Sequence, residues 1–109
     1  GETHLRAFAE GKKFEEIVCS LSGLTRVSLK TIEAVFDGAD TDRFLVLCKA
    51  LNFEWQTVRL MARIGFENQA AIKSQEQMHD SYEKLSHKTA YRIVQFLAER
   101  EQGAAMSPR

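Results

Sequence analysis

The sequence lacks several features that would point to a membrane, secreted or cofactor-binding protein. It contains no run of about 18 apolar residues, the length that a membrane-spanning helix needs, and nothing in it resembles a signal peptide. Two cysteines are too few for a disulfide framework. We therefore expect a cytoplasmic protein without a membrane partner. Because the chain begins with a glycine instead of a methionine, we also expect a fragment of a longer protein.

A net charge is also missing, because 15 basic residues balance 15 acidic ones. A neutral chain lacks the long-range field with which nucleic-acid binders and anionic-membrane binders attract their partners. A nucleic-acid partner is therefore not expected, and one would require a local basic patch.

Catalytic motifs are absent as well. The sequence has no glycine-rich phosphate loop, no Cys-x-x-Cys pair, no nucleophile elbow and no paired carboxylates in apolar surroundings. We therefore predict a protein that is not an enzyme and that needs no cofactor or metal. Cys19 and Cys48 each lie in an apolar stripe without a nearby histidine, which predicts two buried, unreactive thiols.

The chain does contain apolar residues at helical spacing along nearly its whole length, with a single proline near the end. The pattern predicts an all-α, compact bundle of about six to seven helices, built from stacked helical hairpins, with no sheet. Residues 1–101 are predicted to form a single domain and residues 102–109 a flexible tail. The predicted helices cover residues 3–10, 14–22, 28–36, 41–51, 55–65, 66–85 and 87–101.

Candidate helix ends support these boundaries. Ser28, Asp40 or Thr41, and Ser86 are predicted to cap helices, since their side-chain oxygens accept hydrogen bonds from the free amides of a first turn. Gly23, Gly38, Asn52 and Gly65 are predicted to end helices. The last helix is predicted to bury Ala90, Ile93, Val94 and Leu97.

An internal similarity indicates a degenerate repeat of one helical hairpin. Residues 17–24 resemble residues 46–53, and each segment is followed by a hydrophobic-x-x-Thr-hydrophobic helix, with Thr31 in the first copy and Thr57 in the second. Chance similarity between amphipathic helices is the alternative explanation. Stacked hairpins present one exposed helical face, which is the usual binding surface of such modules.

Three segments resemble a specific bacterial family: residues 46–50, residues 55–59 with Trp55, and residues 82–86 continuing to Ala90, Arg92 and Phe96. They are similar to domain of unknown function 2336, a mainly alphaproteobacterial family of longer proteins, over roughly residues 14–100. The resemblance implies a helical fold and a bacterial origin, and it supplies no catalytic residues. The family often has a small hydroxyl residue before the tryptophan, where this chain has Glu54, so the cap of this helix must come from Asn52 or from the charge of Glu54.

Two sequence patterns resemble binding motifs, and each also has a purely structural explanation. Residues 14–36 read as a helix-turn-helix, but the second helix pairs Lys30 with Glu33 and Asp37, an unfavourable charge for a recognition helix. His79, Glu83 and His87 recur every four residues and could hold a metal on one helix. Ser86 is predicted to start a new helix between them, and a solvated polar face explains the three residues more simply than a metal site does.

The resulting hypothesis is a non-catalytic helical protein-interaction or scaffolding module. The alternative is a DNA-binding regulator that uses the helix-turn-helix-like hairpin. The predicted partner-binding surface comprises Lys49, Gln56, Arg59 and Arg63, and self-association is predicted through a narrow apolar seam of the helix between Phe66 and Leu85.

Overall fold

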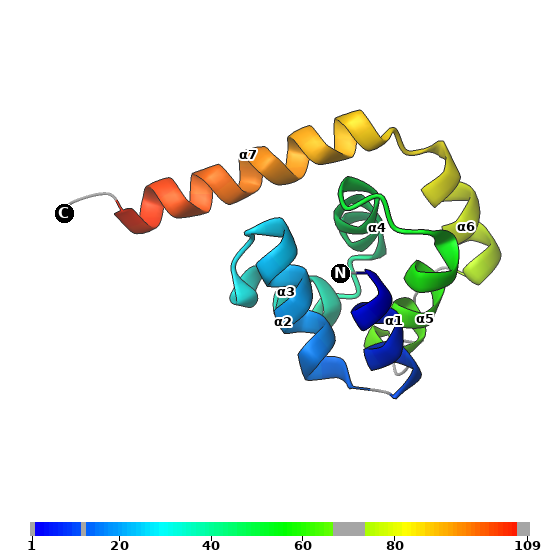
Figure 1. Cartoon of the computed structure of the whole chain (residues 1–109). Helices are drawn as coiled ribbons and strands as arrows, with labels where there is room; N and C mark the ends of the chain where they lie inside the picture. Colours follow the sequence, from blue (N-terminus) through cyan, green and yellow to red (C-terminus); the bar gives the residue numbers. More distant parts are fainter. Residues whose placement is uncertain (1, 12, 67–73, 107–109) are drawn as a thin grey trace.

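The fold is a bundle of α-helices, seen in a computed structural model that describes residues 2–11, 13–66 and 74–106 (Figure 1). The described residues form no strand, which confirms the predicted all-α class. None of their helices is long and apolar enough to span a membrane. The helices are α1 (Glu2–Glu10), α2 (Phe14–Thr25), α3 (Leu29–Asp37), α4 (Thr41–Ala50), α5 (Trp55–Gly65), α6 (Gln75–Lys84) and α7 (His87–Met106).

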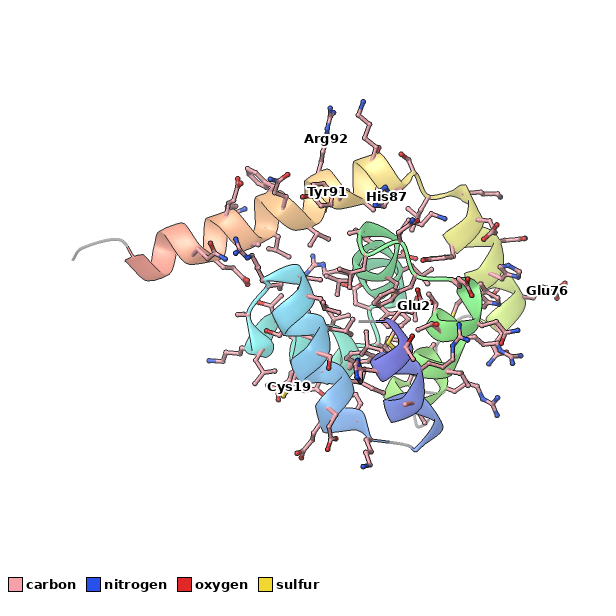
Figure 2. All side chains as sticks on the ribbon, in the orientation of Figure 1. Glu2, Cys19, Glu76, His87, Tyr91 and Arg92 are labelled. Atoms are coloured by element: carbon pink, nitrogen blue, oxygen red, sulfur yellow. The ribbon has the colours of Figure 1, made fainter. Side chains whose placement is uncertain are left out.

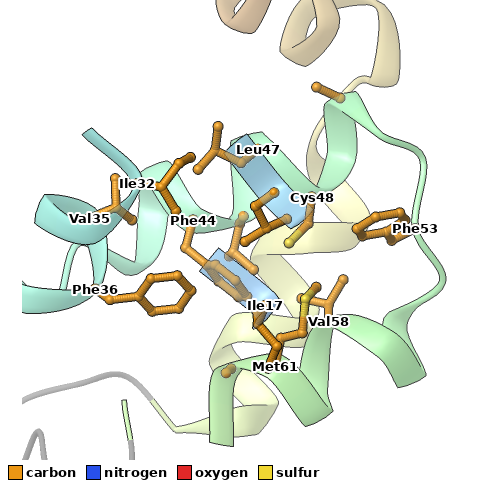
Figure 3. Close-up of a cluster of buried hydrophobic side chains, with 14 of the residues drawn as sticks. Ile17, Ile32, Val35, Phe36, Phe44, Leu47, Cys48, Phe53, Val58 and Met61 are labelled. Carbon is orange, nitrogen blue, oxygen red and sulfur yellow. The ribbon is translucent and has the colours of Figure 1, made fainter. Parts of the chain in front are cut away.

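Helix α4 lies at the centre of the core, with α2, α3, α6 and α7 packed around it. Its buried residues lie on several sides of the helix, including Phe44, Leu45, Leu47 and Cys48 (Figure 3). One end of the core is aromatic: the ring centroid of Phe36 lies 5.2 Å from that of Phe14, 5.4 Å from that of Phe44 and 5.1 Å from that of Phe66.

The caps predicted at three helix starts are confirmed. Ser28 accepts from the backbone N–H of Thr31, Asp40 accepts from that of Arg43, and Ser86 accepts from that of Thr89. Asn52 follows the end of α4, as predicted, and has a left-handed conformation with φ of 58°. The predicted end of α2 at Gly23 is wrong, because the helix continues to Thr25 and ends where Arg26 turns left-handed with φ of 65°.

The predicted single helix between Phe66 and Leu85 is also wrong. Phe66 follows the end of α5, residues 67–73 lie outside the described residues, and α6 begins only after Ser74. Ser74 has extended backbone angles and forms a capping box with Gln77, so a helix cannot run through it. Among the described residues of the predicted self-association seam, Met78 and Tyr82 are buried in the core, Leu85 is half-buried and Gln75 is exposed.

Helix α7 lies along α4, and its C-terminal end projects past α2 and α3 (Figure 1). Its buried row is Ala90, Val94 and Ala98, which recur every four residues. Ile93 was predicted to be buried and is 50 % exposed. The helix continues to Met106.

Cys19 corrects the prediction of two buried thiols. It is exposed on α2, whereas Cys48 at the aligned position of α4 is buried. The difference follows from the position of each helix, since α2 lies at the side of the bundle and α4 at its centre (Figures 2 and 3).

The two segments of the predicted repeat share one polar contact that crosses between helices. In the first copy, Glu101 of α7 accepts hydrogen bonds from the Ser28 backbone N–H and the Thr31 hydroxyl. In the second copy, Glu2 of α1 accepts from the Glu54 backbone N–H at 3.0 Å and from the Thr57 hydroxyl at 2.6 Å. Each copy thus receives a glutamate at the same place, where the free amides of a helix start attract negative charge.

Glu54 does not cap α5 with its own side chain. Its carboxylate instead pairs with Arg6 of α1 at 3.3 Å, and Arg6 also donates to the Thr57 hydroxyl. The cap expected from Asn52 or Glu54 is therefore supplied by Glu2, a residue far away in the sequence.

Candidate interaction surfaces

The four residues predicted to bind a partner lie on α4 and α5, in different environments. Gln56 and Arg63 are exposed on α5, whereas Arg59 is half-buried. Lys49 is half-buried on α4, with its Nζ 4.3 Å from the centroid of the Tyr82 ring. Because this cation–π contact engages the ammonium group, Lys49 belongs to the packing of α6 on α4, and the α5 residues form the more accessible part of the predicted surface.

Trp55 begins α5 and lies between this surface and α6. Its indole stacks on the His79 imidazole, with ring centroids 4.6 Å apart and an interplanar angle of 2°. The tryptophan is half-buried, and its ring also lies 6.0 Å from that of Tyr82. Trp55 therefore joins α5 to α6.

The histidines and glutamate that are spaced by four residues do not share one helix. His79 Nε2 lies 3.9 Å from Glu83 Oε2 on α6, but the backbone is extended at Leu85 and His87 begins α7. The His87 ring lies next to Tyr91 instead, at 6.2 Å between centroids. Across the described parts of the chain, no group of three or more histidine, cysteine, aspartate or glutamate residues is arranged to hold a metal ion.

The helix-turn-helix-like hairpin consists of α2 and α3. Lys30, Glu33 and Asp37 are all exposed on α3, so the surface of the would-be recognition helix carries more negative than positive charge. This is the charge pattern that the sequence predicted, and it opposes contact with phosphates.

A groove of 340 Å³ runs between α7 and the C-terminal ends of α2 and α4. Its apolar lining includes Leu24, Leu51 and Val94, and its polar lining includes Arg26 and Glu99. Leu24 is 44 % exposed at this site. The sequence did not predict the groove, because it forms only where three separate helix segments meet.

The opposite flank of α7 carries two of the three most exposed large apolar side chains of the described chain. Phe96 is 62 % exposed and Ile93 is 50 % exposed, and Leu97 beside them is half-buried. Arg92 and Arg100 lie one turn before and one turn after Phe96. We call these five residues, Arg92, Ile93, Phe96, Leu97 and Arg100, the Phe96 ridge. The Arg92 side chain points away from the body of the protein (Figure 2).

The sequence contained a signal for the Phe96 ridge. A helix that packs on one side needs a single apolar stripe, and Ala90, Val94 and Ala98 provide it. The additional apolar residues Ile93 and Phe96 extend the apolar surface beyond the face that α4 covers. This excess of apolar residues indicates that one apolar row stays exposed, and the packing of α7 on α4 determines which row that is.

Burial determines the ionisation of the central polar groups. Desolvation, followed by the nearby charge of Glu2, raises the pKa of the Cys48 thiol well above its usual value. Desolvation likewise raises the pKa of Tyr82, whose hydroxyl donates a hydrogen bond to the Phe53 carbonyl. Both groups stay neutral at physiological pH, so neither provides a nucleophile or a base.

The described residues form an all-helical domain. Its exposed large apolar side chains lie on the outer faces of helices. Comparison with known proteins places the chain within a family. It belongs to domain of unknown function 2336, an uncharacterised protein family conserved in bacteria, whose model matches residues 1–95. No curated protein and no solved structure matches the chain.

Proposed function

We propose that this domain is a non-catalytic protein-interaction module and that it binds its partner through α7. The observation that carries the proposal is the exposure of Ile93 and Phe96, 50 % and 62 %, side by side on one helix. Adjacent exposed apolar side chains with a charged rim are characteristic of protein-binding surfaces. Aromatic residues and arginine are both enriched at protein interfaces.

Two further features support α7 as the binding element. It is a single helix that remains attached to the centre of the core through Ala90, Val94 and Ala98, so its outer side is presented in one orientation. A rigid helix face loses little conformational entropy when a partner binds. The groove on the other flank of α7 offers an adjoining recess.

Affinity capture from the bacterial host tests the proposal. The wild-type protein and the double variant Ile93→Gln/Phe96→Gln are compared as baits, with Leu29→Gln as a matched control because Leu29 is 43 % exposed on α3. We expect a partner to be retained by the wild type and by Leu29→Gln, and to be lost with the double variant. Equal retention by the double variant, or no partner for the wild type, would contradict the proposal.

The α5 residues Gln56, Arg59 and Arg63 remain a second predicted surface. The same capture with Arg59→Glu/Arg63→Glu decides between the two surfaces. Loss of the partner with this variant, and not with Ile93→Gln/Phe96→Gln, would move the binding site from α7 to α5.

A further inference from the structure

The Phe96 ridge has a simple geometry that constrains its partner. Arg92, Phe96 and Arg100 recur every four residues and form one row along α7, and Ile93 and Leu97 form the adjacent row. With a rise of 1.5 Å per residue, the backbones of the two arginines lie about 12 Å apart. The ridge is therefore an apolar strip with one cation at each end.

Both cations are available for a partner. Arg92 and Arg100 are exposed, and neither forms an ion pair with the described residues. The guanidinium carbon of Arg100 lies 5.9 Å from the Phe96 ring centroid, a contact that leaves its N–H groups open to solvent. Lys88 is exposed one turn before Arg92 and adds to the positive charge of this side of α7.

A second copy of the chain does not match the ridge. If two α7 helices pair antiparallel about Phe96, Arg92 of one copy lies opposite Arg100 of the other, and if they pair in parallel each arginine lies opposite itself. Like charges that face each other across an interface oppose association. The ridge therefore disfavours pairing with itself.

A lipid surface does not match it either. A helix that lies in a membrane interface needs a broad apolar face with its cations on the opposite side. Here Arg92 and Arg100 lie in the same row as Phe96, on the apolar side of the helix. The apolar part of the Phe96 ridge is narrow, like the contact surface between two packed helices.

We propose that the Phe96 ridge binds an acidic amphipathic helix of another protein. This inference rests on the proposed function. The partner helix places apolar side chains against Ile93 and Phe96, and it places one carboxylate near Arg92 and another near Arg100. Since the arginines are about 12 Å apart, these carboxylates lie about seven or eight residues apart on the partner. Arginine favours this recognition because its planar guanidinium group binds a carboxylate with two hydrogen bonds.

The test uses two synthetic helical peptides with the same apolar stripe, one with glutamates and one with lysines flanking the stripe. Fluorescence anisotropy measures their binding to the whole chain. We expect the glutamate peptide to bind at least about tenfold more tightly than the lysine peptide, with the preference decreasing as salt increases. The variant Arg92→Glu/Arg100→Glu should reverse the preference, and Ile93→Gln/Phe96→Gln should weaken the binding of both peptides.

Circular dichroism of each variant verifies that the helices are retained, which is expected because all the substituted residues are exposed. Equal binding of the two peptides, no reversal by the charge-swapped variant, or tighter binding to anionic phosphatidylserine vesicles than to the glutamate peptide would overturn the inference. Host capture that depends on Ile93 and Phe96, combined with no charge preference for the peptides, would leave the proposed function intact and reject only the acidic partner.

Discussion

Glu101, near the end of α7, accepts a hydrogen bond from the backbone N–H of Ser28 at 2.8 Å. This contact joins the last helix to the start of α3 across most of the sequence. The Glu101 carboxylate also accepts from the hydroxyl of Thr31, so it complements the helix start that Ser28 caps. The contact holds α7 over the groove beside α2.

Replacing this carboxylate should destabilise the domain. Glu101→Ala removes the hydrogen bonds to Ser28 and Thr31, and we expect a loss of about 0.5–1.5 kcal/mol in the free energy of unfolding at pH 7. Urea denaturation of the variant and the wild type measures the difference. Glu99→Ala is the matched control, since Glu99 is exposed on the same helix, and it should change the free energy by less than about 0.5 kcal/mol.

The same contact should depend on pH. Partial burial acts to raise the pKa of Glu101, but the hydrogen bonds from Thr31 and Ser28 outweigh it and hold the pKa below the ordinary value of 4.5. A depressed carboxyl pKa stabilises the fold above that ordinary value, and this stabilisation disappears as the pH falls through the lower folded-state pKa. The difference between wild type and Glu101→Ala should therefore shrink in acid, and a difference independent of pH would contradict this assignment.

Two glycines should respond to alanine in opposite ways. At Gly23, within α2, an added Cβ meets no atom within 4 Å, so Gly23→Ala should stabilise the helix by about 0.5–1 kcal/mol. At Gly65, an added Cβ would lie 2.2 Å from Cε1 of the buried Phe36 ring. Gly65→Ala should destabilise the domain by about 1–3 kcal/mol, because the ring has no room to move. Thermal denaturation of both variants tests the pair, and a shift of the same sign would contradict the packing described here.

The two thiols should differ in reactivity. Cys19 is exposed and should react with Ellman's reagent in the native protein, whereas Cys48 is buried with a raised pKa and should react only on unfolding. Titration before and after adding guanidinium chloride counts the thiols of each kind. Cys19→Ala should abolish the fast phase, and a fast phase that persists in this variant would contradict the burial of Cys48.

Tyr82→Phe should show how much a single buried hydroxyl stabilises the fold. Its loss leaves the Phe53 carbonyl without this donor, and we expect a decrease of about 1–2 kcal/mol in the free energy of unfolding. Tyr91→Phe is the control, because Tyr91 is 52 % exposed, and it should have almost no effect. Equal effects of the two substitutions would show that the Tyr82 hydroxyl is not held as described.

Much of the helical framework could be predicted from the sequence because it depends on local rules. Apolar residues at helical spacing and short side chains at Ser28, Asp40 and Ser86 located most helices and three of their caps. Gly23 misled the prediction because a glycine within a helix costs only about 1 kcal/mol, which the packing of α2 exceeds. The break at Ser74 was missed, although a serine followed three residues later by a glutamine is a recognisable capping box.

The candidate site was harder to predict because its position depends on neighbouring helices. Along α7, one row contains Ala90, Val94 and Ala98, and another contains Ile93 and Leu97, with the same spacing in both. Only the close approach of α4 determines that the row with small alanines faces inward. The glutamate contacts of Glu2 and Glu101 were likewise unpredictable, since each joins residues about 50 or more positions apart.

The row that attaches α7 to α4 and the ridge on its outer flank belong to the same stretch of helix, between Ala90 and Arg100. Arg92, Phe96 and Arg100 line up only while that stretch is helical, and the bundle keeps it helical. A ligand of the Phe96 ridge would therefore bind the native chain and not the denatured chain. By mass action, such a ligand at saturating levels should raise the melting temperature in proportion to the logarithm of its concentration. Binding to the ridge would therefore distinguish the folded domain from the unfolded chain.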